Sequence, residues 1–292
     1  MEHILSLSYG KDSMACFGAC ELLGWPIDRV VTAEVWATDT IPADLPPMVE
    51  FKAHADRIIK ERWGIQVEHI RSKRCYQDVF YMVANGENEE RAGKIYGWPY
   101  QRGPWCNSRL KQAALAESRG IQYLGIAVDE PNRFHNLSDA KRSPLVEAGW
   151  TEADCRKWCE ENDLLSPIYT TATRGGCWFC HNQGVGQLRL LRKNYPDLWA
   201  LMLKWDADSP VTFKPPRRQW VTDLDGPETR LVFADDDNTV EREECGYWKN
   251  LPGCTVHDFD RRFALEDEGL IAADDRIFRW SMLEEELNYR WF

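Results

Sequence analysis

The first third of the chain alternates short apolar runs with helical patterns, and this alternation limits the possible folds more than any other feature. The apolar runs predict strands at residues 3–7, 29–35 and 65–70. Helices are predicted between them, over about 14–23 and from Pro46-Pro47 to about Arg62, with Gly64 as the stop. Strands that alternate with helices are typical of a doubly wound α/β fold with a mostly parallel sheet.

The middle of the chain continues this pattern after an interruption. A polar, glycine-rich stretch from Asn85 to Pro104 predicts a long loop, which in a compact domain is usually functional or mobile. The elements predicted after it are a helix over 107–120, a strand over 122–128, a helix from Thr151 to about Asn162, and a helix from about Gln183 to Tyr195 that resumes after Pro196.

The character of the sequence changes after Asp208. The segment becomes rich in proline, then acidic at Asp235-Asp236-Asp237, and then rich in tryptophan and polar residues. We therefore expect one domain over 1–208 and an appended C-terminal extension over 209–292 of uncertain structure.

Composition and charge narrow the classes of function. The 47 acidic side chains exceed the 36 basic ones, so the net charge is −11 and general affinity for nucleic acid is not expected. No apolar run approaches the roughly 18 residues of a membrane span, and residues 1–8 lack the basic and apolar regions of a signal peptide. We therefore expect a cytoplasmic protein without membrane contacts. Its ten cysteines should be core residues, metal ligands or redox groups rather than disulfides.

The segment Ser8-Tyr9-Gly10-Lys11-Asp12-Ser13 joins the first strand to the first helix and has the properties of an anion site. The first N–H groups of a helix have no partner in that helix, and the helix dipole adds partial positive charge there. Gly10 allows close backbone approach, Lys11 supplies a cation, and Ser8 and Ser13 supply hydroxyl donors. Asp12 suits such a site if it caps the helix or meets Mg²⁺. The glycine spacing excludes a Walker A loop and a dinucleotide fingerprint, and a plain strand–helix turn is the alternative.

Several stretches resemble the phosphoadenosine phosphosulfate (PAPS) reductase family of the adenine nucleotide α-hydrolase superfamily. The loop at 8–13 resembles the PP-loop in its Ser-x-Gly-Lys-Asp-Ser form, and Asp39-Thr40 resembles the Asp-Thr-Gly after the second strand, although Ile41 replaces the glycine. The other matching stretches are Trp105–Lys111 (Cys-Thr-x-Arg-Leu-Lys), Gly125–Arg133 (Gly-x-x-x-Asp-Glu-x-x-Arg), and Pro144-Leu145 with Trp150-Thr151. The resemblance spans about residues 3–206 and implies an adenine nucleotide α-hydrolase-like sheet of the HUP type.

The resemblance implies an adenine nucleotide with its phosphates on the loop. Members with Lys and Ser in the loop use ATP with Mg²⁺ and cleave between the α and β phosphates, as in sulfur insertion or sulfate activation. By this interpretation Lys11 and Asp12 are catalytic, and Lys11 neutralises charge that develops on the departing pyrophosphate. The implied nucleotide-binding residues are Ser8, Tyr9, Gly10, Lys11, Asp12, Ser13, Asp39, Thr40, Arg109, Lys111, Asp129, Glu130 and Arg133. Surface salt bridges are the alternative for Arg109, Lys111 and Arg133.

The Cys177-Trp178-Phe179-Cys180 segment has a spacing that suits two thiolates on one metal ion. The resemblance implies Cys106 as a third ligand and as a catalytic residue, because it lies in the loop over the mouth of the nucleotide site. Related PP-loop enzymes hold a [4Fe–4S] cluster on three cysteines with one iron open, and Cys106, Cys177 and Cys180 fit that pattern. Two alternatives stay open. One is a zinc ion with a fourth ligand from His181, Cys155 or Cys159, and the other is thiols without a metal.

The tripeptide Glu244-Cys245-Gly246 resembles part of the Glu-Cys-Gly-Leu-His tail that carries the catalytic cysteine of sulfonucleotide reductases. In that alternative Cys245 attacks the sulfate sulfur of PAPS or APS and forms an S-sulfo intermediate. A third alternative is a nucleotide-binding module that has lost catalysis. The leading prediction is an ATP-dependent adenylating enzyme of sulfur metabolism, with a sulfur donor or reductant protein as a partner. Its acceptor is left open as a small molecule, or as tRNA or DNA, which the acidic charge disfavours.

Overall fold

The structure is a computed structural model of the 292-residue chain. It describes residues 1–84, 92–99, 104–115, 120–135, 137–170, 175–222, 231–233, 240–242, 246–251 and 253–273. Every cysteine within these ranges is a free thiol, which agrees with cysteines that serve as core residues or ligands rather than as crosslinks. Within the same ranges, no helix is both long enough and apolar enough to cross a lipid bilayer.

A parallel sheet forms the centre of the fold, as the sequence predicts, and its five strands include one, β5, that the sequence does not predict. Its strands lie in the order β3-β2-β1-β4-β5, and all neighbouring pairs are parallel. They are β1 (His3–Ser6), β2 (Arg29–Glu34), β3 (Val67–Arg71), β4 (Ile121–Tyr123) and β5 (Lys141–Arg142). Ile4, Leu5 and Val30 are fully buried, because helices cover both faces. The strand order reverses between β1 and β4, and open α/β sheets form ligand crevices at such a position.

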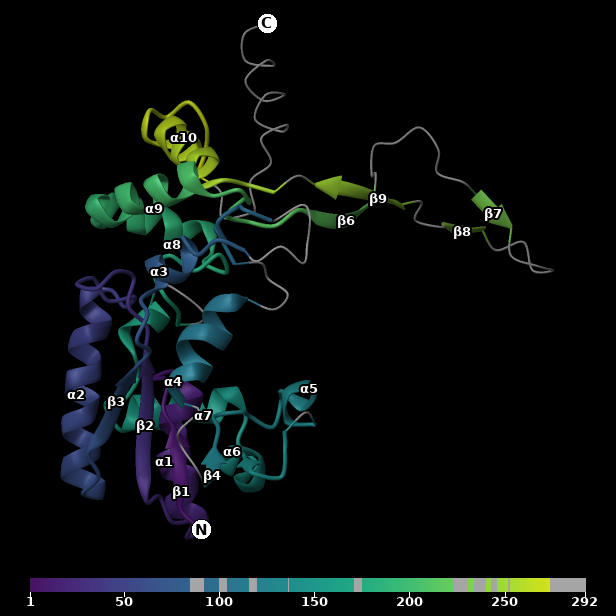
Figure 1. Ribbon diagram of the computed structural model, residues 1–292. Coiled ribbons are helices and arrows are strands. Elements are labelled where there is room, and N and C mark those ends of the chain that lie inside the picture. Colours follow the sequence, from purple (N-terminus) through teal and green to yellow (C-terminus); the bar gives the residue numbers. More distant parts are fainter. Residues whose placement is uncertain are drawn as a thin grey trace, which may run out of the picture.

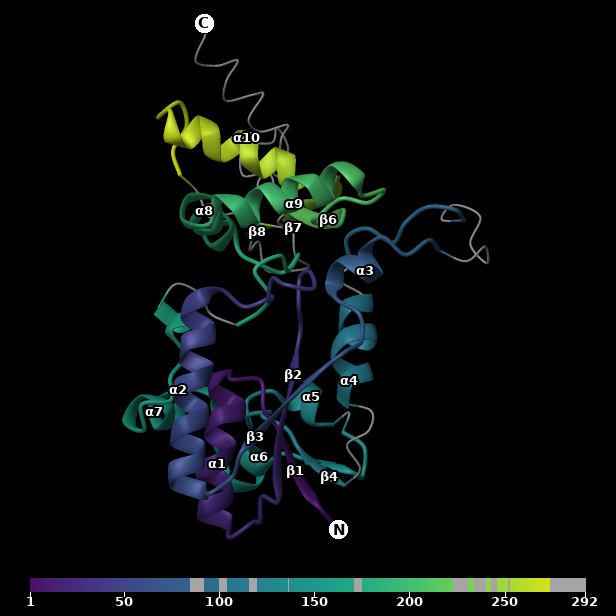
Figure 2. The same cartoon turned by 60° about the vertical axis from the view of Figure 1, so that its left-hand side comes forward.

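Helices cover the two faces of this sheet. Figure 2 shows α1 (Lys11–Leu23), α2 (Pro46–Trp63) and α7 (Glu152–Glu161) on one side, and the π-helical turn η1 (Asn107–Gln112) with α4 (Ala113–Leu115) on the other. Shorter elements are α3 (Tyr76–Phe80), α5 (Pro131–Phe134), α6 (Pro144–Ala148) and the 3₁₀ turn η2 (Pro167–Thr170). The fold is therefore α/β and consistent with a doubly wound, Rossmann-like arrangement.

Most of these elements lie where the sequence predicts them, and local caps explain their ends. The helix α2 begins with two prolines and ends at Gly64, whose φ of 70° suits a residue without a side chain. The helix α7 begins with a capping box in which Thr151 and Asp154 exchange hydrogen bonds. The helix α1 starts earlier than predicted, because the Gly10 carbonyl already accepts the N–H of Met14 at 3.0 Å.

The strand predicted over 122–128 is shorter than expected, since β4 ends at Tyr123. Gly125 explains the difference, because it lies directly against the first turn of α1. A Cβ atom on Gly125 would lie 2.5 Å from the Ser13 nitrogen and 2.6 Å from the Asp12 carbonyl carbon. The chain therefore leaves the sheet after Tyr123 and runs along the 8–13 loop.

The long loop predicted from Asn85 to Pro104 is described in part, at 92–99 and at Pro104. Within it, Ile95 forms an isolated antiparallel bridge with Val83. The Trp105 indole then donates to the Gly97 carbonyl at 3.2 Å. This hydrogen bond links the loop to the start of the helix that follows it. That helix is predicted over 107–120, and its described part runs through η1 and α4 to Leu115.

A second helical layer lies beyond the carboxyl ends of the strands (Figures 1 and 2). It consists of α8 (Val185–Asn194), α9 (Pro196–Asp208) and α10 (Val256–Asp267), which pack on one another. Phe259 of α10 is buried in the same hydrophobic cluster as Trp205 of α9, and Arg189 of α8 lies 2.5 Å from Glu266 of α10. Part of the 209–292 extension is thus packed on the preceding helices, whereas the domain boundary at Asp208 stays a prediction.

Two antiparallel ribbons belong to the same extension. One pairs β6 (Arg217–Thr222) with β9 (Gly246–Leu251), and the other pairs β7 (Leu231–Phe233) with β8 (Val240–Arg242). Cys245, the nucleophile of the reductase alternative, precedes β9 and lies outside the described residues.

Candidate functional site

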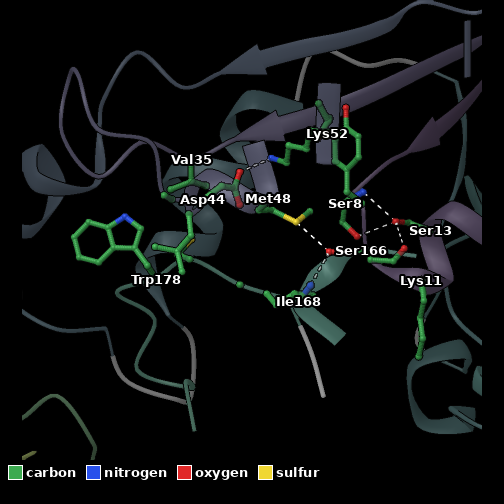
Figure 3. Close-up of a pocket in the computed structure, with 18 of the residues that line it drawn as sticks. Ser8, Lys11, Ser13, Val35, Asp44, Met48, Lys52, Ser166, Ile168 and Trp178 are labelled. Carbon is green, nitrogen blue, oxygen red and sulfur yellow. Dashed lines mark hydrogen bonds and ion pairs between the residues drawn. The ribbon is translucent and has the colours of Figure 1, made fainter. Parts of the chain in front are cut away.

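A cavity of about 1130 Å³ opens at the carboxyl ends of β1 and β2, between the sheet and α8. Its walls include residues 8–13, Thr32, Ala33, Asp44, Lys111, Glu130, Arg133, Glu152, 166–170 and 175–178. Figure 3 shows Ser8, Lys11 and Ser13 at one side of it, with Trp178 and Val35 at the other. The motifs at 8–13, 105–111 and 125–133 therefore meet at one cavity.

Hydrogen bonds within the 8–13 loop hold its shape. Ser13 Oγ accepts the Ser8 N–H at 3.1 Å and lies 3.0 Å from the Gly10 carbonyl, to which it donates. Gly10 is the N-cap of α1, so no side chain there bonds to the N–H groups of the first turn. The Lys11 N–H instead donates to the Tyr169 hydroxyl at 3.0 Å. An oxygen of an anion can replace this hydroxyl, since the N-terminus of a helix favours negative charge.

Tyr9 supports the loop from the side of the sheet. Its φ of 57° is left-handed, which is unusual for a bulky side chain. The ring is 1% exposed, and its hydroxyl donates to Asp56 Oδ1 at 2.5 Å. Burial raises the pKa of Tyr9, and the hydrogen bond to Asp56 raises it further. The Tyr9 side chain is therefore buried and bonded to Asp56. Of this residue, the backbone is the part that could make the predicted nucleotide contact.

Lys11 is 9% exposed, and its Nζ lies 2.8 Å from both Asp12 Oδ1 and Glu152 Oε2. Burial alone would lower the pKa of Lys11, but the hydrogen bonds and charges of the two carboxylates raise it. The amine is therefore cationic at any physiological pH. Because two carboxylates hold it, a bound phosphate must compete with them or arrive with a counter-charge.

Carboxylates outnumber cations around this amine. Asp12, Glu130 and Glu152 all line the cavity. Burial raises the pKa of Asp12, and although Lys11 lowers it, the charges of Glu152 and Glu130 raise it again. The carboxylate oxygens of these residues are the kind of ligand that Mg²⁺ takes in nucleotide sites. Among the described residues the three carboxylates do not form a set whose ligand atoms all lie within 4.8 Å, so a Mg²⁺ ion here would need phosphate oxygens as further ligands.

The 125–133 motif divides between the cavity and the scaffold. Glu130 and Arg133 line the cavity, and the Arg133 guanidinium lies 2.7 Å from Glu130 Oε1. Asp129 lies outside the lining, and its carboxylate accepts the N–H of Glu152 at 3.1 Å. Asp129 thus caps α7 and positions Glu152, the partner of Lys11, rather than contacting the cavity itself.

The remaining predicted contacts divide in the same way. Lys111 lines the cavity. Arg109, on the same turn, donates to the Tyr96 hydroxyl at 2.9 Å, which is a hydrogen bond and not the salt bridge of the alternative. Asp39, whose side chain is 87% exposed, lies 3.6 Å from Arg71, and Thr40 donates its N–H to Thr38. Neither Asp39 nor Thr40 belongs to the cavity lining that the structure describes.

The three predicted ligand cysteines come together beside the cavity. The Cys180 N–H donates to the Cys177 carbonyl at 3.0 Å, and the Trp178 indole donates to the Pro42 carbonyl, so this turn is anchored to the β2–α2 connection. Cys106 precedes the π-helical η1, a helix type that is often found at functional sites. Burial and the neighbouring Cys180 raise the pKa of Cys106 to about 11, and burial raises that of Cys177 to about 12.

The spacing of these three thiols does not suit a single metal ion. With Zn–S bonds of about 2.3 Å, tetrahedral thiolates lie about 3.8 Å apart. Among the described residues, Cys106, Cys177 and Cys180 do not form a set whose ligand atoms all lie within 4.8 Å. Of the residues offered as a fourth ligand, Cys155 and Cys159 are buried in the separate core beneath α1, whereas His181 is buried next to Cys180 in the chain. The cysteines therefore lack single-ion spacing among the described residues, and a cluster on them stays a prediction.

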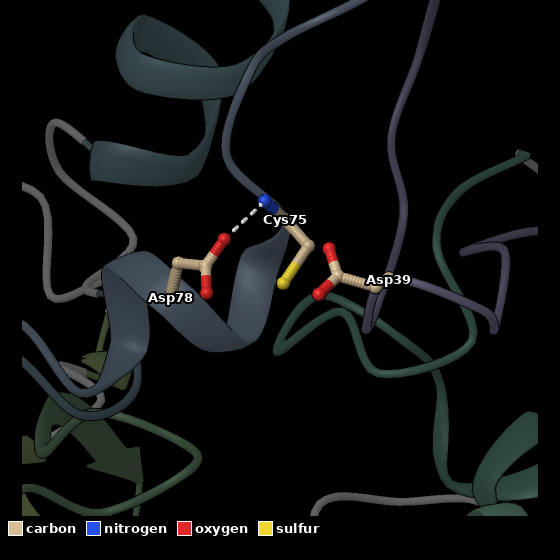
Figure 4. Close-up of side chains that lie close together, drawn as sticks. All are labelled: Asp39, Cys75 and Asp78. Atoms are coloured by element: carbon tan, nitrogen blue, oxygen red, sulfur yellow. Dashed lines mark hydrogen bonds between the residues drawn. The ribbon is translucent and has the colours of Figure 1, made fainter.

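One set of described residues does have single-ion spacing, namely Asp39, Cys75 and Asp78 (Figure 4). Each already has a protein partner. Asp78 accepts the Cys75 N–H at 2.8 Å, the Cys75 thiol accepts the Asp78 N–H in the same capping box, and Asp39 pairs with Arg71. The cap at the start of α3 accounts for this proximity.

Glu152 and Tyr169 are the site residues that the sequence does not predict. Glu152 is read from the sequence as part of a helix start, and Tyr169 lies in a segment without a recognisable motif. Their partner Lys11 is 141 and 158 residues away along the chain. An acidic residue directly after the Thr151 cap is the one local signal for Glu152.

Comparison with known proteins adds no relative. No protein-family model matches the chain, and no curated protein matches it. What the chain does is therefore inferred from its residues and their arrangement.

Proposed function

We propose that the protein is an ATP-binding PP-loop enzyme that cleaves ATP between the α and β phosphates and adenylates an acceptor in sulfur metabolism. The observation that carries the proposal is the 8–13 loop. It lies at the switch point of the sheet and ends in an uncapped helix N-terminus beside a buried lysine. The resemblance to the PAPS reductase family and the superfamily of HUP type belongs to the same proposal.

The 8–13 loop supplies the hydrogen-bond donors for phosphate binding. The N–H groups at the start of α1 and the hydroxyls of Ser8 and Ser13 are donors that can reach phosphate oxygens, and the Tyr169 hydroxyl gives up its place on the Lys11 N–H. Lys111 and Arg133 add positive charge from the other walls of the cavity. Their role is to bind and orient the triphosphate.

Lys11 acts on the bond that breaks. Asp12 and Glu152 would hold a Mg²⁺ ion that arrives with ATP, and the amine of Lys11 would then be able to turn toward the phosphates. Negative charge develops on the leaving pyrophosphate, and a fixed cation in a site shielded from water stabilises that charge. A lysine amine is protonated at physiological pH even without these partners, so Lys11 supplies charge rather than a proton.

The products of ATP turnover test this function. Water can take the place of the missing acceptor, so we expect slow hydrolysis of ATP to AMP and pyrophosphate when the purified protein is incubated with ATP and Mg²⁺ at high enzyme concentration. ADP and orthophosphate would contradict the proposal, because they result from cleavage of the other phosphoanhydride bond.

The three thiols support a second element of the proposal, a [4Fe–4S] cluster. Cys106, Cys177 and Cys180 would hold it, and Cys106 and Cys177 both pack against the hydrophobic cluster that contains Trp178 and Phe179. Cys177 also lines the nucleotide cavity, so a cluster there lies next to the bound ATP. Such a cluster would supply an open iron for a sulfur ligand, which links the adenylating site to sulfur transfer.

The reductase alternative depends on Cys245, which follows two glutamates just before β9. In that case the same cavity binds a sulfonucleotide, and the thiolate of Cys245 attacks its sulfur. The preference of the cavity for ATP or for PAPS separates the two functions.

A further inference from the structure

The Tyr76 side chain, at the start of α3, carries a polar atom that the described structure leaves unsatisfied. The residue is 1% exposed, and its hydroxyl has no hydrogen-bond partner among the residues described. A buried hydroxyl without a partner costs free energy, so such groups are rare unless an ion, a water or a ligand completes them.

Aromatic neighbours keep this ring in one position. Its centroid lies 4.2 Å from that of Phe179, 4.8 Å from Trp105 and 5.4 Å from Trp205. The backbone N–H of Tyr76 also donates to the Trp36 carbonyl at 2.7 Å. The hydroxyl therefore cannot swing out to solvent without breaking this packing.

The two segments that carry the three thiols pack against the Tyr76 ring through Trp105 and Phe179. After burial, the groups that raise the pKa of Tyr76 are Cys106, Cys180 and Cys177, through the negative charge that each acquires as a thiolate. These are the cysteines proposed to hold the cluster. Two of the aromatic neighbours, Trp105 and Phe179, are adjacent in sequence to these cysteines, so the ring and the thiols form one unit.

We propose that the Tyr76 hydroxyl is a hydrogen-bond donor to a sulfur atom of the metal centre held by Cys106, Cys177 and Cys180. The inference rests on the proposed function, because it needs a thiolate-bound centre at this position. Sulfur atoms that carry negative charge accept hydrogen bonds, and such bonds hold metal ligands in place and tune the centre. Tyr76 is thus a positioning residue for the centre.

The Tyr76→Phe variant separates this role from simple packing. Phenylalanine keeps the ring and removes the orphan hydroxyl, so the metal-free variant should have an equal or higher melting temperature than the metal-free wild type. The metal-loaded variant should change in the opposite sense. It should lose iron to a chelator about tenfold faster or more, since outer-shell partners are typically worth about 10–100-fold in metal affinity. Its reduction potential should fall, because a hydrogen bond to sulfur stabilises the reduced, more negative state.

The experiment uses the full chain, reconstituted anaerobically with iron and sulfide. Iron content, the rate of iron loss and the reduction potential are measured alongside two reference variants. Tyr81→Phe is the matched control, because the Tyr81 hydroxyl donates to Asp208 at 2.6 Å rather than to the centre. Cys177→Ala reports whether the iron depends on the proposed ligands, and its iron content should fall.

The outcomes distinguish the inference from the proposal beneath it. Iron bound by the wild type and lost from Cys177→Ala, together with faster loss and a lower potential in Tyr76→Phe alone, supports the hydrogen bond. A wild type that binds no iron, or a Cys177→Ala variant that keeps it, overturns the cluster and the inference with it. A Tyr76→Phe variant that binds iron and matches Tyr81→Phe in both readouts overturns the role of Tyr76 and leaves the cluster standing.

Discussion

Replacement of Lys11 by alanine is expected to reduce AMP formation from ATP by about 10²–10³-fold, which corresponds to about 3–4 kcal/mol of lost transition-state stabilisation. The cation is buried and held beside the loop, so water cannot fully replace its charge at the leaving pyrophosphate. The rate of AMP formation under single-turnover conditions, with ATP above its dissociation constant, measures the effect on the chemical step.

The control for this variant is Lys157→Ala. Lys157 lies on α7 with Glu152, but its side chain is 74% exposed and its amine lies 3.9 Å from Glu161. We expect unchanged AMP formation from this variant, since exposed ion pairs contribute little. If Lys11→Ala is folded and forms AMP within about threefold of the wild-type rate, the cation has no role in the chemistry and the mechanism is wrong.

Substitution of Gly125 by alanine is expected to destabilise the fold by about 1–3 kcal/mol, as overpacking of a close contact does. The added Cβ would meet backbone atoms, at 2.5 Å from the Ser13 nitrogen and 2.7 Å from its Cα, so no flexible side chain can move aside. The first turn of α1 would have to shift. ATP affinity should therefore fall together with stability, and denaturant unfolding and ATP titration measure the two effects.

A second glycine provides the matched control for this variant. Gly176 also lines the cavity, but a Cβ atom there would have no heavy atom within 4 Å. The Gly176→Ala variant should therefore keep the stability and ATP affinity of the wild type. Equal behaviour of the two variants would show that contact between the 125–133 segment and the loop does not shape the site.

The parts of the fold that depend on local patterns are predictable from the sequence. The first three strands follow apolar runs, and α2 and α7 are bounded by prolines, Gly64 and the Thr151 cap. The early end of β4 is not predictable in this way, because it results from the contact of Gly125 with a turn more than a hundred residues earlier. The packing of α10 on α8 and α9 is likewise a long-range contact without a local signal.

The same division applies to the candidate site. The position of the 8–13 loop beside the cavity is predictable, because six consecutive residues between a strand and a helix define it, whereas its nucleotide-binding role stays a prediction. Asp129 is interpreted from the sequence as a nucleotide contact, but in the fold it caps α7 and orients Glu152. A sequence motif assigns a residue to a site, but it does not show whether the side chain contacts the ligand or holds another residue in place. The hydrogen-bond partners of the side chain in the fold make that distinction.

Calorimetric titration of the anaerobically purified protein with ATP plus Mg²⁺, and separately with PAPS, shows which nucleotide the loop binds. The loop has a cation and donors for a triphosphate, so we expect saturable binding of ATP and no measurable binding of PAPS. Binding of PAPS without binding of ATP would contradict the proposal, and would make a sulfonucleotide reductase with Cys245 as its nucleophile the better account.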